Sequence, residues 1–244
     1  MNTIKRIIPV LTILNQKLVK TQYFRNPRYI GDPINALKIF NEKKVDEIIL
    51  LDIGASKFEK SVNFKFLKDL ASECFIPFAY GGGVASESDA ENVFKCGVEK
   101  VIINTAAMKD MSLIATLSKN YGSQSVVVCI DYNYGWFNSS PVAYSKSGQL
   151  KVKSDIIALS KEAESNGAGE LMLQDIGRDG SFRGYDKNFI VKVTKELNIP
   201  VIACGGAKDK QDCVEILNVA DAAAAGSCFV FKNNNRDSIL INYF

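Results

Sequence analysis

Short apolar runs alternate with longer amphipathic stretches along the whole chain. The apolar runs are rich in Ile, Val and Leu, and most of them end in small or polar residues. Runs that are apolar throughout are typical of strands buried on both faces of a parallel sheet. Their alternation with helix-length stretches predicts such a sheet. We expect strands at residues 6–12, 47–52, 77–80, 100–103, 125–131, 170–174, 199–207 and 221–227.

The stretches between these strands carry recognisable helix starts. Asp32 precedes Pro33, and Ser86 lies three residues before Asp89, which are patterns of an N-cap and of a near-capping box. We expect helices at 33–44, 61–73, from 86, at 110–122, from Ser154 or Asp155 to 167, from 186, and at 208–218. The tail after Asn233 is short for an eighth helix.

Two connections are longer than the rest. Residues 13–30 form a polar and aromatic stretch that we expect to be a strand-to-helix loop, the place where such folds put mobile lids. Residues 132–153 show strand-like spacing of aromatic residues, which predicts a β-hairpin inserted over the mouth of the fold.

The chain repeats itself at one fixed offset. Residues 76–83 match residues 199–206, and residues 45–54 match residues 168–177, with Glu47/Glu170 and Asp52/Asp175 as identical pairs. Two matches in one register indicate two homologous halves, roughly 1–122 and 123–244. A single domain over 1–244 is therefore expected to be an α/β fold, a (β/α)8 TIM barrel built of two half-barrels.

Glycine turns follow the third and seventh strands. Gly205 and Gly206 let backbone N–H groups approach a ligand, and Gly226 precedes Ser227 where the last strand gives way to a helix start. Ordinary turns are the alternative interpretation. The doubling of the pattern favours a ligand with two phosphates.

Polar side chains gather where the strands end, which is where barrel enzymes place their active sites. Asp131 ends an otherwise apolar strand, so it is a candidate acid or base, the alternative being a cap for backbone N–H groups. Thr12 is its counterpart in the first half and does not titrate near neutral pH. The candidate residues at the strand ends are Thr12, Asp52, Asn104, Thr105, Asp131, Gln174, Asp175, Asp179 and Ser227.

Four charged residues open strands at the opposite end of the barrel. They are Arg6, Glu47, Lys100 and Glu170. The two-residue period of a strand puts Arg6 on the inward face with Ile8 and Val10, so two cations and two anions are expected to form a neutral ring. A stabilising polar floor is the alternative to a functional gate.

The composition of the chain argues against several classes of function. The chain has no histidine, which excludes histidine bases, histidine metal ligands and Ser-His-Asp triads. A net charge of +3 gives no argument for nucleic acid, and no apolar run is long enough for a membrane span. The six cysteines lack a CxxC pattern, and the first residues lack a signal-peptide pattern, so we expect reduced thiols, a cytoplasmic location, no metal and no cofactor.

Nearly the whole chain resembles HisF, the cyclase subunit of imidazole glycerol phosphate synthase. Gly122-Ser-Gln and Asn104-Thr-Ala-Ala107 separate it from the sister isomerase HisA. The other matching segments are Lys5-Arg-Ile-Ile-Pro9, Gly31-Asp-Pro33, Leu51-Asp-Ile53, Gly81-Gly-Gly83, Gly167-Ala-Gly-Glu170, Arg178-Asp-Gly180 and Gly184-Tyr-Asp186.

The resemblance implies a heterodimer with a HisH-like glutaminase, whose ammonia crosses the barrel to the strand ends. It implies that Asp131 is the general acid, that Lys20 is the lysine of the first loop, and that Arg6, Glu47, Lys100 and Glu170 form the ammonia gate. The phosphate contacts it implies are Gly83, Asn104 and Thr105 in one half, and Asp179, Gly180, Gly206 and Ser227 in the other.

Two departures change the expected function. The family's catalytic aspartate on the first strand is Thr12 here, and the usual Thr-Ser-Ile-Asp after the sixth strand is Gln174-Asp-Ile-Gly177. Loss of a general base commonly costs about 10² to 10⁴ in rate. The pattern resembles second HisF-type paralogues in surface-sugar gene clusters, where the barrel passes ammonia to a sugar amidotransferase. A working histidine-pathway cyclase and a non-catalytic scaffold that binds a bisphosphate or sugar ligand stay open as alternatives.

Overall fold

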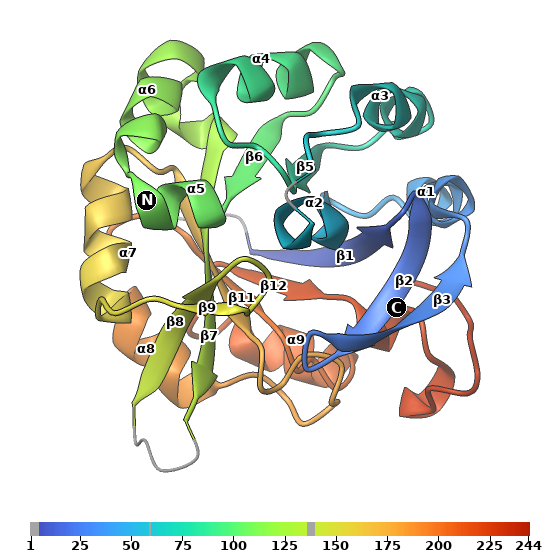
Figure 1. Cartoon of the computed structure of the whole chain (residues 1–244). Helices are drawn as coiled ribbons and strands as arrows, with labels where there is room; N and C mark the ends of the chain where they lie inside the picture. The colour runs from blue at the N-terminus through green and yellow to red at the C-terminus, as the bar shows by residue number, and fades with distance from the viewer. Residues whose placement is uncertain (1–4, 59, 136–139) are drawn as a thin grey trace.

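A closed barrel of parallel strands forms the centre of the molecule (Figure 1). The computed structural model describes residues 5–58, 60–135 and 140–244. Neighbouring strands pair in chain order, and the last pairs with the first. Within the described residues the barrel strands are β1 (Arg6–Leu14), β4 (Ile48–Asp52), β5 (Phe78–Gly81), β6 (Lys100–Ile103), β7 (Val126–Tyr134), β10 (Glu170–Asp175), β11 (Val201–Cys204) and β12 (Ala222–Ala225). The expected (β/α)8 fold is confirmed.

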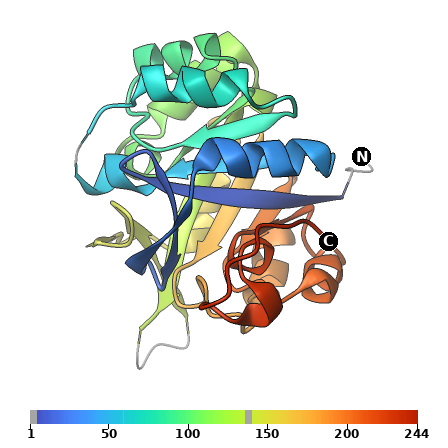
Figure 2. The ribbon, with the colours of Figure 1, turned by 90° about the vertical axis from the view of Figure 1, so that its right-hand side faces the viewer.

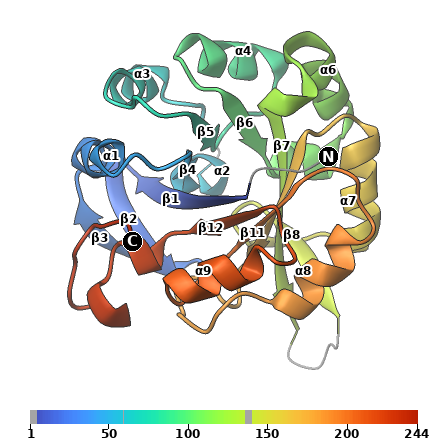
Figure 3. The same cartoon turned by 180° about the vertical axis from the view of Figure 1, so that it is seen from behind.

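Helices surround the strands in chain order, as seen from behind in Figure 3. They are α1 (Pro33–Glu42), α3 (Phe64–Ser72), α4 (Glu87–Lys95), α6 (Ser112–Tyr121), α7 (Ile156–Ser165), α8 (Lys187–Thr194) and α9 (Lys210–Ile216). Asp32, Ser86 and Asp155 cap α1, α4 and α7 through their side chains, so the expected starts are correct. Two short helices, α2 (Ile53–Lys57) and α5 (Thr105–Lys109), follow β4 and β6 and were not expected.

The stretch expected to be a loop between 13 and 30 is a β-hairpin, so that prediction was wrong. Strands β2 (Lys17–Gln22) and β3 (Arg25–Gly31) extend antiparallel from the end of β1. Asn15-Gln16 connects β1 to β2, and Tyr23-Phe24 connects β2 to β3. In each turn both residues have a positive φ, as two-residue hairpin turns of the I′ type require. Residues 18–21 are buried, which the polar composition of the segment concealed.

The second hairpin was expected and is present. Strand β8 (Pro141–Ser145) pairs antiparallel with the end of β7, and β9 (Leu150–Lys151) pairs with β8. Part of the expected segment, residues 136–139, lies outside the described residues, as do Met1–Ile4 of the N-terminus. Both hairpins lie at the end of the barrel opposite the start of β1 (Figure 2).

Two separate apolar clusters stabilise the barrel. One fills the space between strands and helices, and the other fills the interior with side chains from alternate strand positions. The interior set is Ile8, Val10, Ile49, Ala79, Ile102, Val127, Cys129, Met172, Ile202, Cys204, Ala222 and Ala224. β12 consists of alanines, and Ala222 and Ala224 face the interior, so this side of the interior is lined by small side chains.

A short C-terminal tail takes the place of an eighth α-helix. After β12 the described residues form the 3₁₀ turns η2 (Ser227–Phe229) and η3 (Lys232–Asn234), and the tail passes between α9 and α1 (Figure 3). Phe229 packs against Phe40 of α1 and against Tyr243 and Phe244 of the tail, with ring centroids 4.7–6.2 Å apart. These aromatic contacts cover the core where a helix is missing.

Candidate functional site

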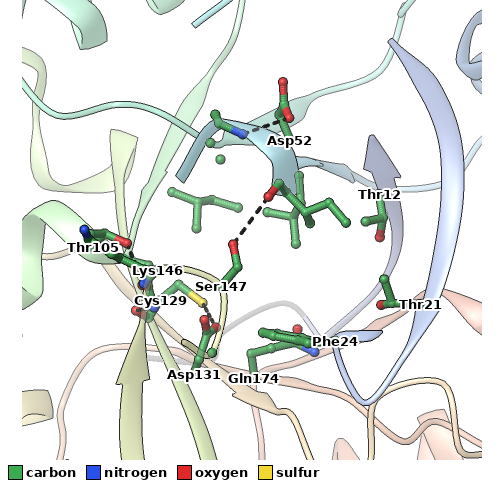
Figure 4. Close-up of a pocket in the computed structure, with 18 of the residues that line it drawn as sticks. Thr12, Thr21, Phe24, Asp52, Thr105, Cys129, Asp131, Lys146, Ser147 and Gln174 are labelled. Atoms are coloured by element: carbon green, nitrogen blue, oxygen red, sulfur yellow. Dashed lines mark hydrogen bonds between the residues drawn. The ribbon is translucent and has the colours of Figure 1, made fainter. Parts of the chain in front are cut away.

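A cavity of about 1500 Å³ opens at the carboxyl ends of the barrel strands (Figure 4). Both glycine turns and both hairpins contribute to its lining. The structure brings fourteen of the residues singled out from the sequence to this one cavity: Thr12, Lys20, Asp52, Gly83, Asn104, Thr105, Asp131, Gln174, Asp179, Gly180, Gly205, Gly206, Gly226 and Ser227.

The sequence repeat is also a repeat of backbone geometry. Gly82 has a φ of 132°, and a Cβ atom there would lie 2.5 Å from the carbonyl oxygen of Asp52. Gly205 has a φ of 94°, and a Cβ atom there would lie 2.6 Å from the carbonyl oxygen of Asp175. Both positions therefore require glycine. Each turn brings bare backbone to the rim of the cavity, as anion-binding turns do.

Asp131 is a buried carboxyl group with a raised pKa. The residue is 7 % exposed at the end of β7. Burial raises its pKa to about 7, the charge of Asp179 acts in the same direction, and a hydrogen bond from the Cys129 thiol, with Sγ 3.6 Å from Oδ1, acts against it. A carboxyl group that titrates near neutral pH can donate or accept a proton there.

Thr12 lies across the cavity from Asp131 (Figure 4). Its hydroxyl oxygen is 3.4 Å from the Nζ atom of Lys20, which also donates to the carbonyl oxygen of Val10 at 2.6 Å. Lys20 is only 4 % exposed, and burial lowers its pKa to about 8. A Cβ atom on Gly226 would lie 2.3 Å from this Nζ, so the glycine makes room for the amine.

Gln174 and Asp175 point to different sides of β10. Gln174 pairs with Asp131 in register and lines the cavity. Asp175 is 2 % exposed and lies 3.3 Å from the Nε atom of Arg178, and its Oδ2 atom accepts no hydrogen bond within the described residues. Burial raises the pKa of Asp175 to about 6. The strand alternation places this carboxyl group outside the cavity lining.

Asp52 and Asp179 hold backbone segments at the rim. Asp52 accepts from the N–H groups of Gly54 and Ala55 at the start of α2, and burial raises its pKa. Asp179 accepts from the hydroxyl of Thr21 at 2.7 Å and from the N–H of Phe24 at 3.4 Å, both on the β2–β3 hairpin. Burial also raises the pKa of Asp179.

The sequence did not single out the turn between β8 and β9. The N–H of Lys146 donates to the hydroxyl of Thr105 at 3.0 Å, and Ser147 reaches the carbonyl oxygen of Ile53 at 3.4 Å (Figure 4). Asn104 donates to the carbonyl oxygen of Cys129 at 3.0 Å. These residues lie in the hairpin expected over the mouth at 132–153, and the turn signal Lys146-Ser-Gly148 could have singled them out within it.

Four charged side chains form a closed ring at the other end of the barrel. Arg6 binds Glu47, and it binds Glu170 at 3.0 Å; Lys100 binds Glu47 and Glu170 at 2.9 Å each. None of the four side chains is more than 17 % exposed. Each cation forms an ion pair with both anions. The two positive and two negative charges leave the ring without a net charge.

The described part of the chain contains no group of three or more Cys, Asp or Glu side chains that could hold a metal ion. In the same residues, no helix combines the length and apolar character of a transmembrane segment.

Comparisons with known proteins agree on one family. A family model for histidine biosynthesis proteins matches residues 6–235. A Pseudomonas aeruginosa protein, provisionally named imidazole glycerol phosphate synthase subunit hisF2, is 43 % identical over 98 % of this chain and 95 % of its own length. A Vibrio vulnificus protein, provisionally named subunit hisF3, is 39 % identical over 98 % and 92 %. The imidazole glycerol phosphate synthase subunit HisF of Helicobacter hepaticus is 39 % identical over 95 % and 92 %. The chain therefore belongs to the HisF family of imidazole glycerol phosphate synthase subunits.

Proposed function

We propose that this chain receives ammonia from a HisH-like glutaminase and presents it to an acceptor at a bisphosphate-binding mouth. The observation that carries the proposal is the ring of Arg6, Glu47, Lys100 and Glu170 at the end of the barrel opposite the cavity. Buried ion pairs often stabilise a fold no better than apolar residues would. A ring of buried ion pairs at the end of the barrel opposite the cavity fits a gate for a small neutral molecule.

The lining of the interior between ring and cavity suits a small neutral molecule better than an ion. Its wall is apolar, and Ala79, Ala222, Ala224, Cys129 and Cys204 contribute small side chains to it. An apolar passage favours neutral ammonia over ammonium, because a charge is costly to desolvate.

The doubled glycine turns support a ligand with two anionic groups. The backbone geometry recurs at Gly82 and Gly205, and both turns border the same cavity. Lys60, Lys109 and Lys146 also line this cavity, so cations are available for the anions. A phosphorylated sugar has the required chemistry.

Thr12 favours amidation of a sugar or related acceptor over cyclisation. Cyclisation in this family relies on a carboxylate at this strand end, and a threonine hydroxyl does not titrate near neutral pH. Transfer of ammonia, which is itself the nucleophile, requires only an acid such as Asp131 at the acceptor. A separate sugar amidotransferase is a further partner that this function admits.

A working histidine-pathway cyclase is the second candidate. The observation that favours it is the carboxyl group of Asp131, whose pKa of about 7 suits acid–base catalysis. Complementation of a histidine auxotroph that lacks its own HisF tests this candidate directly, and growth would favour it.

Cyclase turnover with ammonium salt tests the main proposal. We expect negligible imidazole glycerol phosphate formation by the wild type, and a gain of about 10²-fold or more for Thr12→Asp, since a general base contributes about 10² to 10⁴. Thr12→Asn is the matched control, because it adds similar volume without a titratable group. Efficient cyclisation by the wild-type protein would refute the proposal.

The partner is tested separately with the glutaminase and amide-¹⁵N-labelled glutamine. We expect binding of the glutaminase to persist, and label to reach a product only when this chain is present. Binding without any labelled product would instead point to a scaffold.

A further inference from the structure

The amine of Lys20 is buried at the edge of the cavity without a carboxylate partner. The residue is 4 % exposed and lines the cavity, and its Nζ atom contacts two neutral oxygens, the carbonyl of Val10 and the hydroxyl of Thr12. No ion pair of Lys20 with a carboxylate occurs among the described residues. A buried lysine usually has such a partner. The charge of Asp179 acts on Lys20, but no ion pair joins the two described side chains, and Asp179 accepts from Thr21 and Phe24.

The surroundings of this amine are built to hold it beside the second glycine turn. Gly226 leaves the space that Nζ occupies, since a Cβ atom there would lie 2.3 Å from it. Gly226, Ser227 and Gly205 line the same cavity as Lys20, so a ligand whose phosphate binds at these turns can bring its carbon skeleton to the amine.

We infer that Lys20 is a nucleophile that forms a Schiff base with the carbonyl group of a phosphorylated sugar or ketose. The nitrogen lone pair of the neutral amine attacks the carbonyl carbon and gives a carbinolamine. Loss of water, whose oxygen comes from the carbonyl, leaves the C=N bond of an imine. Asp131 in its protonated form is an acid in the same cavity that can protonate the departing hydroxide.

The electrostatics of the site support this chemistry. Burial lowers the pKa of Lys20 to about 8, whereas Asp179, Cys204 and Cys228 act to raise it and Arg236 to lower it. An ordinary lysine has a pKa of about 10.4, so near pH 7 the neutral fraction of Lys20 is about 10²-fold larger. A desolvated lysine is a recurrent Schiff-base nucleophile for this reason.

The inference rests on the proposed delivery of ammonia and names a carbonyl compound as the acceptor, which ammonia would convert to an imine rather than to an amide. Ammonia that reaches the cavity can attack the imine carbon. The bond to the lysine nitrogen then breaks, which releases the free amine of Lys20 and leaves the ligand carbon double-bonded to the nitrogen of ammonia. In this exchange ammonia replaces the lysine amine on the same carbon atom, so atoms and electrons balance without an oxidant or a reductant. A protonated imine is more electrophilic than the parent carbonyl, and Asp131 is an acid in the same cavity that can supply this proton, so the covalent step would prepare the acceptor for ammonia.

Reductive trapping with dihydroxyacetone phosphate and sodium borohydride tests the inference on the full chain. Reduction of the imine leaves a stable adduct, and peptide mass mapping locates it. We expect the adduct on Lys20 at least about ten-fold above the level on Lys119, an exposed lysine of α6, given the larger neutral fraction of a lysine with lowered pKa. Unphosphorylated dihydroxyacetone should give less adduct at Lys20, and added inorganic phosphate should compete.

Matched variants separate a nucleophile from a lysine that only binds phosphate. Lys20→Arg keeps the cation but should lose the adduct, whereas Lys119→Arg should keep the adduct at Lys20. The position of the adduct on the wild-type protein already tests the inference, so the test does not depend on whether Lys20→Arg folds. Adducts spread evenly over exposed lysines, or none at Lys20, would overturn it. The trap needs neither ammonia nor a glutaminase, so its failure is distinct from failure of the proposed function.

Discussion

At the scale of single residues, two titratable side chains in the cavity at the mouth of the barrel have pKa values shifted by burial. Asp131 and Lys20 are both buried in the lining of one cavity, and burial raises the pKa of the acid and lowers that of the amine. Both shifts move the group toward its neutral form at pH 7. The site therefore combines an acid that can donate and an amine that can attack, without an ion pair between them in the described contacts.

The raised pKa of Asp131 predicts that the protein is less stable at alkaline pH. The unfolded carboxyl group releases its proton near pH 4 and the folded one near pH 7, so between these values the folded state binds more protons. The free energy of unfolding then falls as the pH rises through this window, and the full penalty is present above it. Asp131→Asn should remove the penalty and be more stable than the wild type at pH 8 by about 2–4 kcal/mol, with little difference near pH 4.

Denaturant unfolding of both proteins at about pH 4 and pH 8 measures this effect, because the first value lies at the lower end of the titration range and the second about one unit above its upper end. Asp69→Asn, at an exposed position of α3, is the control and should leave the pH dependence unchanged. An Asp131→Asn protein with the wild-type pH dependence would contradict the assignment.

At the scale of elements, the β2–β3 hairpin is fastened to the loop after β10. Thr21 donates to Asp179, the N–H of Tyr23 donates to the carbonyl oxygen of Asp179 at 3.0 Å, and Arg236 of the tail reaches the carbonyl oxygens of Thr21 and Gly180 at 3.3 Å each. The hairpin carries Lys20 into the cavity. Its attachment is therefore part of what positions the amine.

Removal of the Thr21 hydroxyl should loosen this hairpin. Thr21→Val keeps the shape and the strand propensity but leaves the buried Oδ2 atom of Asp179 with only the longer hydrogen bond from the N–H of Phe24, at a cost of about 1–3 kcal/mol. We expect faster amide hydrogen exchange across residues 17–31, because local opening becomes easier. Thr116→Val is the control, since that hydroxyl bonds to its own helix on the surface. Unchanged exchange in the hairpin would show that other contacts hold it.

The same hairpin shows what the sequence could predict and what it could not. The barrel strands follow from apolar runs, and the caps at Asp32, Ser86 and Asp155 follow from short-range rules. The hairpin was taken for a loop because its burial depends on residues distant in the sequence, among them Asp179 and Arg236, more than 150 residues away. The repeat brought both glycine turns into one predicted site, whereas the turn at Lys146 depended on a distant partner, Thr105.

At the scale of the whole molecule, the charged ring joins the two halves of the repeat. Arg6, Glu47 and Lys100 come from the first half and Glu170 from the second. Glu47 and Glu170 are equivalent by the repeat, whereas their cationic partners are not, since Arg6 begins β1 and Lys100 begins β6. The ring is thus a feature of the closed barrel and not of either half.

The ring should behave as one cooperative unit in a double-mutant cycle. Glu47→Gln leaves a surplus positive charge among buried groups, and Lys100→Met leaves a surplus negative charge, so each single change should cost about 2–4 kcal/mol of unfolding free energy. The double variant restores neutrality and keeps the Arg6–Glu170 pair, so its cost should fall short of the sum by about 1–3 kcal/mol. The exposed pair Lys161–Glu196 supplies a control cycle with a coupling below about 1 kcal/mol. Additive costs in the ring, equal to those of the surface pair, would mean that the four charges do not act together and would weaken the case for a gate.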